Sequence, residues 1–245
     1  MRAAGAAVVV AVTRGGAVQA ARLVRHDPAA ELIVGQRAHA WVADLPNPVT
    51  VAPRGGLGPL LGERMQASAG QVVAFLSVGA TVRLVAPYLR GKGLDPGVVA
   101  VDESARFAVA VVGGHLGGAN AWAEHVAACL GAQPVVTTAS DRRDLPAIDL
   151  LGREQGWQVE ASPEALREAA GALINGEPVA LVEEADVWCP NRPPPPNLER
   201  LVTLAQADPA RHSALLWVTE RAGDREQEAV WAQRLVRYRP RQAGP

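Results

Sequence analysis

The sequence predicts an α/β fold of two consecutive domains, each a mostly parallel sheet flanked by helices. Short runs of β-branched and apolar residues alternate with longer stretches of helical periodicity along the 245 residues. Most of these runs are apolar on both alternating faces, as in strands that helices cover on two sides. The composition, 49% hydrophobic and 20% charged, is that of globular domains with hydrophobic cores.

The first domain is expected to span residues 1–140. Its expected strands are Ala7–Val12, Leu32–Val34, Val72–Leu76, Val98–Val101, Phe107–Val112 and Val135–Thr137. Helices are expected at Ala17–Arg25, Leu57–Ala67, Ala80–Leu89 and Ala119–Leu130. The last of these has an apolar stripe of helical spacing, and Gly131 and Pro134 end it.

The second domain is expected to span residues 141–245, after a polar stretch at Thr137–Pro146. Four consecutive prolines make Cys189–Pro196 an extended loop rather than a helix or a central strand. The expected strands are Val179–Val182, Ala214–Val218 and Arg234–Tyr238, and the expected helices are Ile148–Gln155, Pro163–Ile174 and Arg225–Ala232.

Composition argues against several classes of protein. A net charge of −1 gives no reason to expect a nucleic-acid partner. Cys129 and Cys189 are far apart and have no zinc-binding spacing, so neither a disulfide framework nor a metal site is expected. No apolar run approaches the roughly 20 residues of a membrane helix. The apolar start is interpreted as a buried strand rather than a signal peptide, so the cytoplasm is the expected location.

The glycine-rich turn Gly113-Gly114-His115-Leu116-Gly117-Gly118 follows an apolar strand and opens a helix. Glycines allow close approach of the backbone, and the free N–H groups of a helix start favour an anion or a developing oxyanion. His115 adds a side chain that titrates near neutrality. A purely structural strand-to-helix connection, with Asn120 as a cap, explains the same residues and stays open.

Other polar residues also follow expected strands, where open α/β sheets bind their ligands. Asp102 and Glu103 suit a base or an orienting group for His115, although solvated turn carboxylates are commoner. Thr137, Thr138 and Asp141 could bind a polar ligand or cap a helix. Arg83 could bind a carboxylate or lie along the surface with its charge in water.

Four blocks together resemble one family, the cobalt-precorrin-5A hydrolases (CbiG) of the anaerobic, early-cobalt cobalamin route. The blocks occur in the family's order and spacing, and the resemblance is looser over the first 70 residues and moderate from Ala147 to Val218. They are Gly79–Pro87, Lys92–Glu103, Gly113–Asn120 and Pro134–Asp141.

The sequence departs from the family pattern in three places. Gly113 stands where the family usually has Ser, and Ser140 where it has Thr. The segment Leu235–Arg241 resembles the lead-in to a third domain, which the printed sequence does not continue into.

The resemblance implies hydrolysis of a δ-lactone on a cobalt-containing macrocycle, with loss of acetaldehyde to give cobalt-precorrin-5B. For this chemistry, residue type and position at a strand end suggest His115 as general base and then acid, with Asp102 or Glu103 as an orienting group. The N–H groups of Gly114 and Gly117–Ala119 would bind the oxyanion or a carboxylate. Cobalt would arrive inside the substrate, so no protein-bound metal or other cofactor is expected. The remaining candidate substrate-binding residues are Arg83, Gly113, Gly118, Asn120, Thr137, Thr138 and Asp141.

Two other classes stay open. One is a non-catalytic corrinoid-binding subunit that needs a separate third-domain protein or a neighbouring pathway enzyme. The other is a nucleotide-dependent oxidoreductase or transferase, against which the missing P-loop and dinucleotide fingerprint count. The sequence leaves a homodimer open and gives no sign of a membrane partner.

Overall fold

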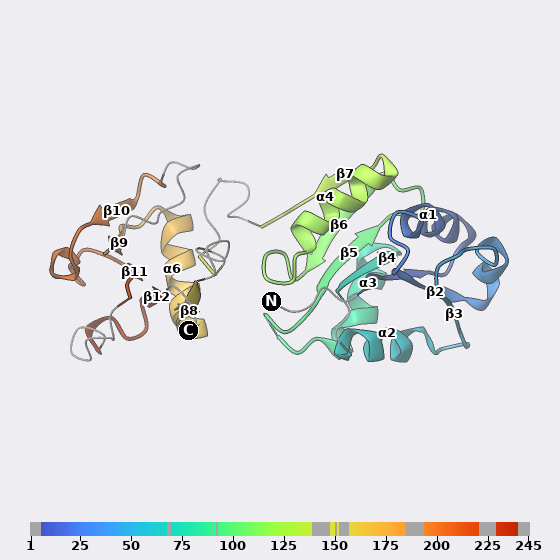
Figure 1. Cartoon of the computed structure of the whole chain (residues 1–245), viewed down its shortest axis with the longest axis horizontal. Helices are drawn as coiled ribbons and strands as arrows, with labels where there is room; N and C mark the ends of the chain where they lie inside the picture. Colours follow the sequence, from blue (N-terminus) through green and yellow to red (C-terminus); the bar gives the residue numbers. More distant parts are fainter. Residues whose placement is uncertain are drawn as a thin grey trace, which may run out of the picture. The chain divides into compact units, whose positions relative to one another are not determined.

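The structure, a computed structural model, describes residues 6–67, 70–91, 93–138, 148–149, 151, 157–184, 194–220 and 229–239. The chain forms two compact units that divide between Thr137 and Thr138, drawn in Figure 1. The sequence prediction put this boundary after residue 140. No described helix is both long enough and apolar enough to span a bilayer.

The first unit is built on a seven-stranded sheet of order β3-β2-β1-β4-β5-β6-β7. The strands are β1 (Val8–Ala11), β2 (Glu31–Gly35), β3 (Val49–Ala52), β4 (Gln71–Phe75), β5 (Gly97–Val101), β6 (Phe107–Val112) and β7 (Gln133–Val135). The helices are α1 (Arg14–Val24), η1 (Gln36–Trp41), α2 (Leu57–Gln66), α3 (Val78–Val85), η2 (Ala86–Tyr88) and α4 (Ala119–Leu130).

The direction of β6 decides where the loops of this unit lie. Strands β1 to β5 are parallel, β6 is antiparallel to β5, and β7 is parallel to β6. Residues 102–106 join β5 to β6 as a tight turn, in which Asp102 accepts from the amides of Arg106 and Phe107, both at 2.7 Å. The carboxyl ends of β6 and β7 therefore lie at the edge where β1 to β5 begin.

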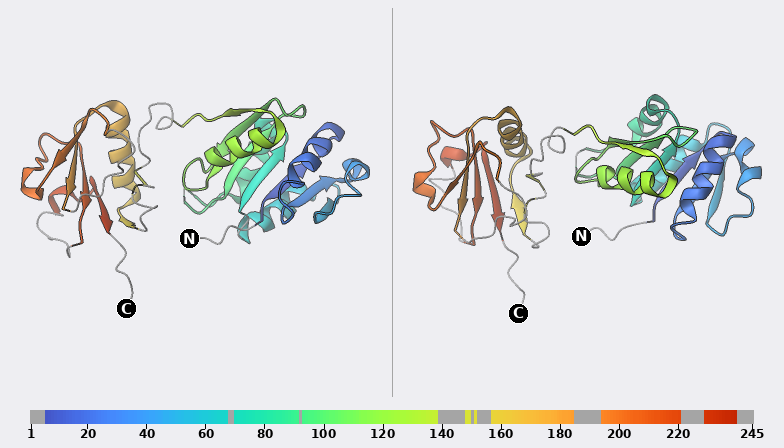
Figure 2. Two further views of the ribbon diagram at one scale, coloured as in Figure 1. Left: turned by 45° about the horizontal axis from the view of Figure 1, so that its top comes forward. Right: turned by 90° about the horizontal axis from the view of Figure 1, so that it is seen from above.

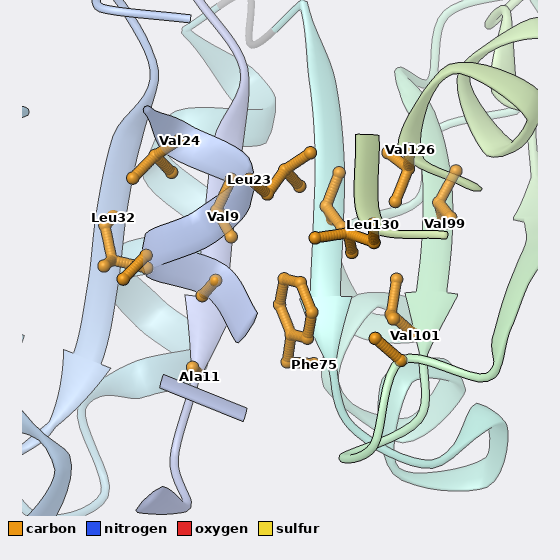
Figure 3. Packing of buried hydrophobic residues seen from close by; sticks show 14 of the residues in the cluster. Val9, Ala11, Leu23, Val24, Leu32, Phe75, Val99, Val101, Val126 and Leu130 are labelled. Carbon is orange, nitrogen blue, oxygen red and sulfur yellow. The ribbon is translucent and has the colours of Figure 1, made fainter. Parts of the chain in front are cut away.

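Helices cover the two faces of the sheet from opposite sides. Figure 1 shows α1 and α4 on one face and α2 and α3 on the other. Buried Phe75 and Leu32 pack beneath α1, and Val99 packs against Val126 and Leu130 of α4 (Figure 3). The second face buries Val8, Val72 and Leu61 with their neighbours. Burial on both faces explains why the central strands are almost entirely apolar.

The second unit is a five-stranded sheet of order β10-β9-β11-β12-β8. Among the described strands of this sheet, only β8 is antiparallel to its neighbour. Figure 2 shows α6 lying along one face of this sheet. The buried Tyr238 hydroxyl donates to the Ile148 carbonyl at 2.9 Å, and burial raises the pKa of that hydroxyl well above its ordinary value. The elements are β8 (Gln158–Glu160), α6 (Pro163–Asn175), β9 (Val179–Glu183), β10 (Leu198–Leu201), η3 (Leu204–Gln206), β11 (Ala214–Val218) and β12 (Leu235–Arg239).

The predicted fold class is confirmed: both units are mostly parallel sheets flanked by helices. Every expected strand is present, with each end within two residues of the expected one, whereas β3, β8 and β10 were missed. These three are short, and β8 and β10 carry charged residues on partly exposed positions. Most of the expected helix Ile148–Gln155, the first part of Arg225–Ala232 and most of the proline-rich loop lie outside the described residues.

Candidate active site at the glycine-rich loop

Residues 113–118 form a compact loop that connects β6 to α4. Gly113 and Gly118 adopt positive φ values of 70° and 82°, which a residue with a side chain rarely does. The Gly118 amide donates to the His115 carbonyl at 3.0 Å, and the Ala119 amide donates to the Gly113 carbonyl at 3.1 Å. The backbone thus folds back on itself before α4 begins.

The loop packs directly against the start of β5, backbone against backbone. A Cβ atom on Gly117 would lie 2.7 Å from the Gly113 carbonyl oxygen and 2.9 Å from the Gly97 nitrogen. The Gly117 carbonyl accepts from the Gly97 amide at 3.0 Å and from the Gln71 side-chain amide at 2.7 Å. Sequence reasoning found the loop but missed Gln71 and Gly97, which reach it only through the sheet.

The predicted set of free amides is only partly correct. The amides of Gly118, Ala119 and Asn120 all donate to carbonyls within the loop, so they are not available to a ligand in this conformation. The amides of Gly114 and Gly117 have no acceptor within the described part of the chain. These two remain candidates for binding an oxyanion.

His115 lies at the bend of the loop and is half-buried, outside the hydrophobic core. Its neighbour Leu116 is exposed, and the Leu116 Cδ1 atom is 3.5 Å from where a Cβ on Gly93 would stand. Asp95, almost fully buried, accepts from the amides of Arg90 at 2.7 Å and Gly91 at 3.1 Å. A second ordered loop thus borders the first.

Asp102 and Glu103 do not lie with His115, which corrects the predicted orienting role. They follow the carboxyl end of β5, whereas the glycine loop lies beside the amino end of that strand. Five strand residues separate the two ends by about 15 Å. The expectation placed both segments in one crevice at the carboxyl ends of strands, and the antiparallel direction of β6 puts the glycine loop at the opposite edge of the sheet.

The Asp102 carboxylate accepts hydrogen bonds from within its own turn. Its partial burial raises its pKa, but amide donors, including Phe107 and Arg106, and the Arg106 guanidinium at 3.3 Å hold the pKa below the ordinary value. These contacts give Asp102 a structural role in the β5–β6 turn.

The sequence prediction overlooked a topological switch point, where the helices that follow two neighbouring strands leave toward opposite faces of the sheet. It lies at the carboxyl ends of β1 and β4. Helix α1 leaves β1 toward one face, and α3 leaves β4 toward the other, with Thr13 and Ser77 as their N-caps. Glu103 lies against the start of α1, with its Cγ atom 2.6 Å from where a Cβ on Gly15 would stand. Thr13-Arg14-Gly15-Gly16 directly after the first strand was the available signal.

The remaining predicted residues divide between the two sides of the sheet. Thr137 follows β7 and so lies at the same edge as the glycine loop, and Thr138 is the first residue of the second unit. Arg83 lies on α3, and its exposed guanidinium donates to the Gly79 carbonyl of its own helix at 3.3 Å. Asp141 lies outside the described residues. Among the side chains that the structure describes, no group of three His, Cys, Asp or Glu could hold a metal ion.

The fold and loop together define a class: two-unit α/β proteins with a glycine-rich strand-to-helix loop carrying an imidazole. The family model for the N-terminal region of cobalamin synthesis G matches residues 61–141. The model for the cobalamin biosynthesis central region matches residues 146–240. The chain therefore belongs to the CbiG family and carries its N-terminal and central regions.

Two curated relatives are similar to this chain over part of their length. A cobalt-precorrin-5A hydrolase of Priestia megaterium is 37% identical over 173 residues, which are 69% of this chain and 46% of that protein. A cobalt-precorrin-5A hydrolase of Salmonella typhimurium is 34% identical over 117 residues, 46% of this chain and 33% of that protein. The chain thus matches less than half the length of either relative.

One solved structure also covers the chain. A crystal structure described as a cobalamin biosynthesis protein G homolog from Sulfolobus solfataricus covers 97% of this chain and 61% of its own. The TM-score is 0.46 and the sequence identity is 17%.

Proposed function

We propose that the chain takes part in the cobalt-precorrin-5A hydrolase reaction of cobalamin biosynthesis. In this reaction water opens a δ-lactone on a cobalt-containing macrocycle, and a two-carbon unit leaves as acetaldehyde to give cobalt-precorrin-5B. The observation that carries the proposal is the 37% identity to a relative of that name over 69% of the chain. That match is joined by both CbiG regions in their family order.

His115 is proposed as the group that moves protons. It accepts a proton from water as the water oxygen bonds to the lactone carbonyl carbon. It then returns the proton to the ring oxygen as the carbon–oxygen bond breaks. Finally it accepts the proton of the new hydroxyl as the carbon–carbon bond breaks, and the electron pair stays on the macrocycle carbon. Its half-buried place at a loop bend supports this role.

The surrounding residues would position the substrate. The amides of Gly114 and Gly117 would stabilise the tetrahedral oxyanion. Thr137, at the same edge of the sheet, would bind a peripheral carboxylate, and Thr138 and Asp141 are proposed to bind others. We propose that cobalt enters as part of the substrate, that protein side chains hold no metal, and that the reaction takes place in the cytoplasm.

The test is acetaldehyde release from the lactone substrate by two matched histidine variants. His115→Ala should lower turnover by at least about 100-fold, the usual contribution of a positioned acid–base group. His125→Ala is the control, because His125 is exposed on α4, where its ring lies beside Trp122 and its Nε2 atom is 3.7 Å from the Cys129 Sγ atom. Equal turnover of His115→Ala and the wild type would contradict the proposed role of His115 in proton transfer.

The same assay distinguishes an enzyme from a non-catalytic corrinoid-binding subunit. This second candidate is considered because the chain matches less than half the length of either relative. The chain is assayed alone and together with a separate third-domain protein. Acetaldehyde from the chain alone supports a complete active site. Acetaldehyde only from the mixture indicates that the third-domain protein is required, and its absence from both indicates a binding role.

A further inference from the structure

Gln71 contacts the glycine loop from another strand. It is the first residue of β4, and its Nε2 atom donates to the Gly117 carbonyl at 2.7 Å. Gly97, the first residue of β5, pairs with Gln71 in the register between the two strands. A Cβ atom on Gly97 would overlap the Gln71 Oε1 atom. The absence of a side chain at Gly97 therefore leaves the Gln71 amide room to reach the loop.

The carbonyl that Gln71 contacts belongs to a peptide group that also contacts His115. The Gly117 carbonyl and the Gly118 amide are the two sides of one planar trans peptide, and they point in opposite directions. The Gly118 amide donates to the His115 carbonyl at 3.0 Å. Two hydrogen bonds, joined by one rigid peptide group, thus connect the Gln71 side chain to the backbone of His115.

The two residues that flank this peptide group do not fix its orientation by themselves. Both are glycines, and a glycine backbone rotates at little steric cost. The orientation therefore depends on the donors that bind the Gly117 carbonyl. These are the Gly97 amide of β5 at 3.0 Å and the Gln71 side chain of β4 at 2.7 Å.

The other end of the Gln71 amide argues against a role in packing alone. Its Oε1 atom is buried and has no hydrogen-bond donor among the residues that the structure describes. A buried acceptor without a donor lowers stability, and an apolar side chain of similar size would avoid this cost. A glutamine at this position is therefore better explained by the effect of its Nε2 atom on the loop than by the stability of the sheet.

We propose that Gln71 is a positioning residue for His115. By holding the peptide group between Gly117 and Gly118, it fixes the bend of the loop at which the imidazole lies. An acid–base group must lie within hydrogen-bond reach of the proton it moves, so a loop that rotates would slow the chemical step. The inference rests on the proposed function and adds to it a residue that acts through the loop backbone.

The first test is acetaldehyde release by Gln71→Met, assayed with the full chain and with the third-domain protein if that protein is required. The kcat should fall at least about tenfold while KM stays within about twofold, because positioning acts on the chemical step rather than on substrate binding. Gln133→Met is the matched control, since Gln133 also begins a strand of this sheet, β7, and is exposed.

A conservative variant tests the hydrogen bond itself. Gln71→Glu keeps the shape of the side chain, but an ionised carboxylate can only accept hydrogen bonds, whereas a protonated carboxyl group can donate one to the Gly117 carbonyl. The kcat of this variant, divided by that of the wild type at the same pH, should therefore rise as the pH falls. The same ratio for Gln71→Met should not change with pH.

The second test does not depend on turnover. In proton NMR spectra, the imidazole signals of His115 should shift in Gln71→Met, whereas those of the exposed His26 should not. Gln133→Met should leave both sets of signals unchanged. Urea unfolding of each variant measures any accompanying loss of stability.

Unchanged His115 signals in Gln71→Met would refute the inference, whatever the loss of stability to urea, because the contact would then serve the sheet alone. Wild-type kcat in that variant would refute it as well. Neither result contradicts the proposed function. A wild type that releases no acetaldehyde, alone or with the third-domain protein, would contradict the proposed function, and shifted His115 signals would still support the positioning contact.

Discussion

At the residue scale, Gly117 shows how a backbone contact can dictate a residue type. Its carbonyl accepts two hydrogen bonds, from Gly97 and Gln71, while its Cα lies against the backbone of Gly113. The glycines of this loop are therefore needed for packing, whatever ligand the loop binds. Packing and function are both satisfied by the same residues, which is why the sequence left the two interpretations open.

Replacing Gly117 by Ala should destabilise the first unit by about 1–3 kcal/mol, because the added methyl group would overlap backbone atoms that have little room to move. Urea unfolding of the first-unit transition measures this change. Gly171→Ala is the control: a Cβ there meets nothing within 4 Å on α6, so it should leave stability unchanged or raise it by up to about 1 kcal/mol. Equal effects would contradict the packing argument.

The candidate site was only partly predictable from the sequence at this scale. His115 and the glycines were found because special residues cluster locally between a strand and a helix. Gln71 and Asp95 were missed, because each acts through a contact with the loops that only the folded sheet creates. Asp102 and Glu103 were assigned to His115 because strand direction was assumed rather than derived.

At the element scale, the turn between β5 and β6 carried a signal that was available in the sequence. Only residues 102–106 separate the two strands. A parallel connection needs a dozen or more residues, so five permit only an antiparallel pair. Applying this rule would have placed the glycine loop correctly, whereas the β1–β4 switch point follows from strand order, which spacing alone does not reveal.

An ion pair between Glu31 of β2 and Arg64 of α2 makes the stability of the first unit depend on pH. Glu31 accepts from Arg64 at 2.7 and 3.0 Å and from Thr50 at 2.8 Å, and the Arg64 hydrogen bonds lead in holding the pKa of Glu31 below its ordinary value despite partial burial. A carboxyl group whose pKa is lower in the folded state stabilises the fold at pH values above its unfolded-state pKa. This stabilisation is lost as the pH falls through the folded-state pKa.

Arg64→Met should therefore lower the free energy of unfolding of the first unit by up to about 1 kcal/mol at neutral pH, a value discounted for solvent screening. The difference from the wild type should shrink below about pH 4. Urea titrations at several pH values measure it. Arg167→Met is the control, since its pair with Glu164 is exposed and should contribute nothing measurable. A pH-independent difference would argue against the ion pair.

At the scale of the whole molecule, each unit has its own hydrophobic core. The clusters around Phe75 and around Leu61 belong to the first unit, and those around Tyr238 and around Trp231 belong to the second. Each core is assembled within one sheet and its own helices. The two units therefore meet the structural condition for folding separately.

A fragment of residues 1–138 should fold alone, because both hydrophobic clusters of the first unit lie wholly within it. Circular dichroism with cooperative urea unfolding checks the fold. An unfolded fragment would contradict the independence of the two cores.

The reversed strand β6 also changes how this protein should be compared with others. In doubly wound proteins, ligands are sought above the carboxyl ends of the parallel strands. Here that rule points to Thr13, Ser77 and Glu103, while His115 and its glycines lie at the opposite edge of the first unit's sheet. Transferring a ligand from such a protein by superposition would leave it on the far side of the sheet from His115.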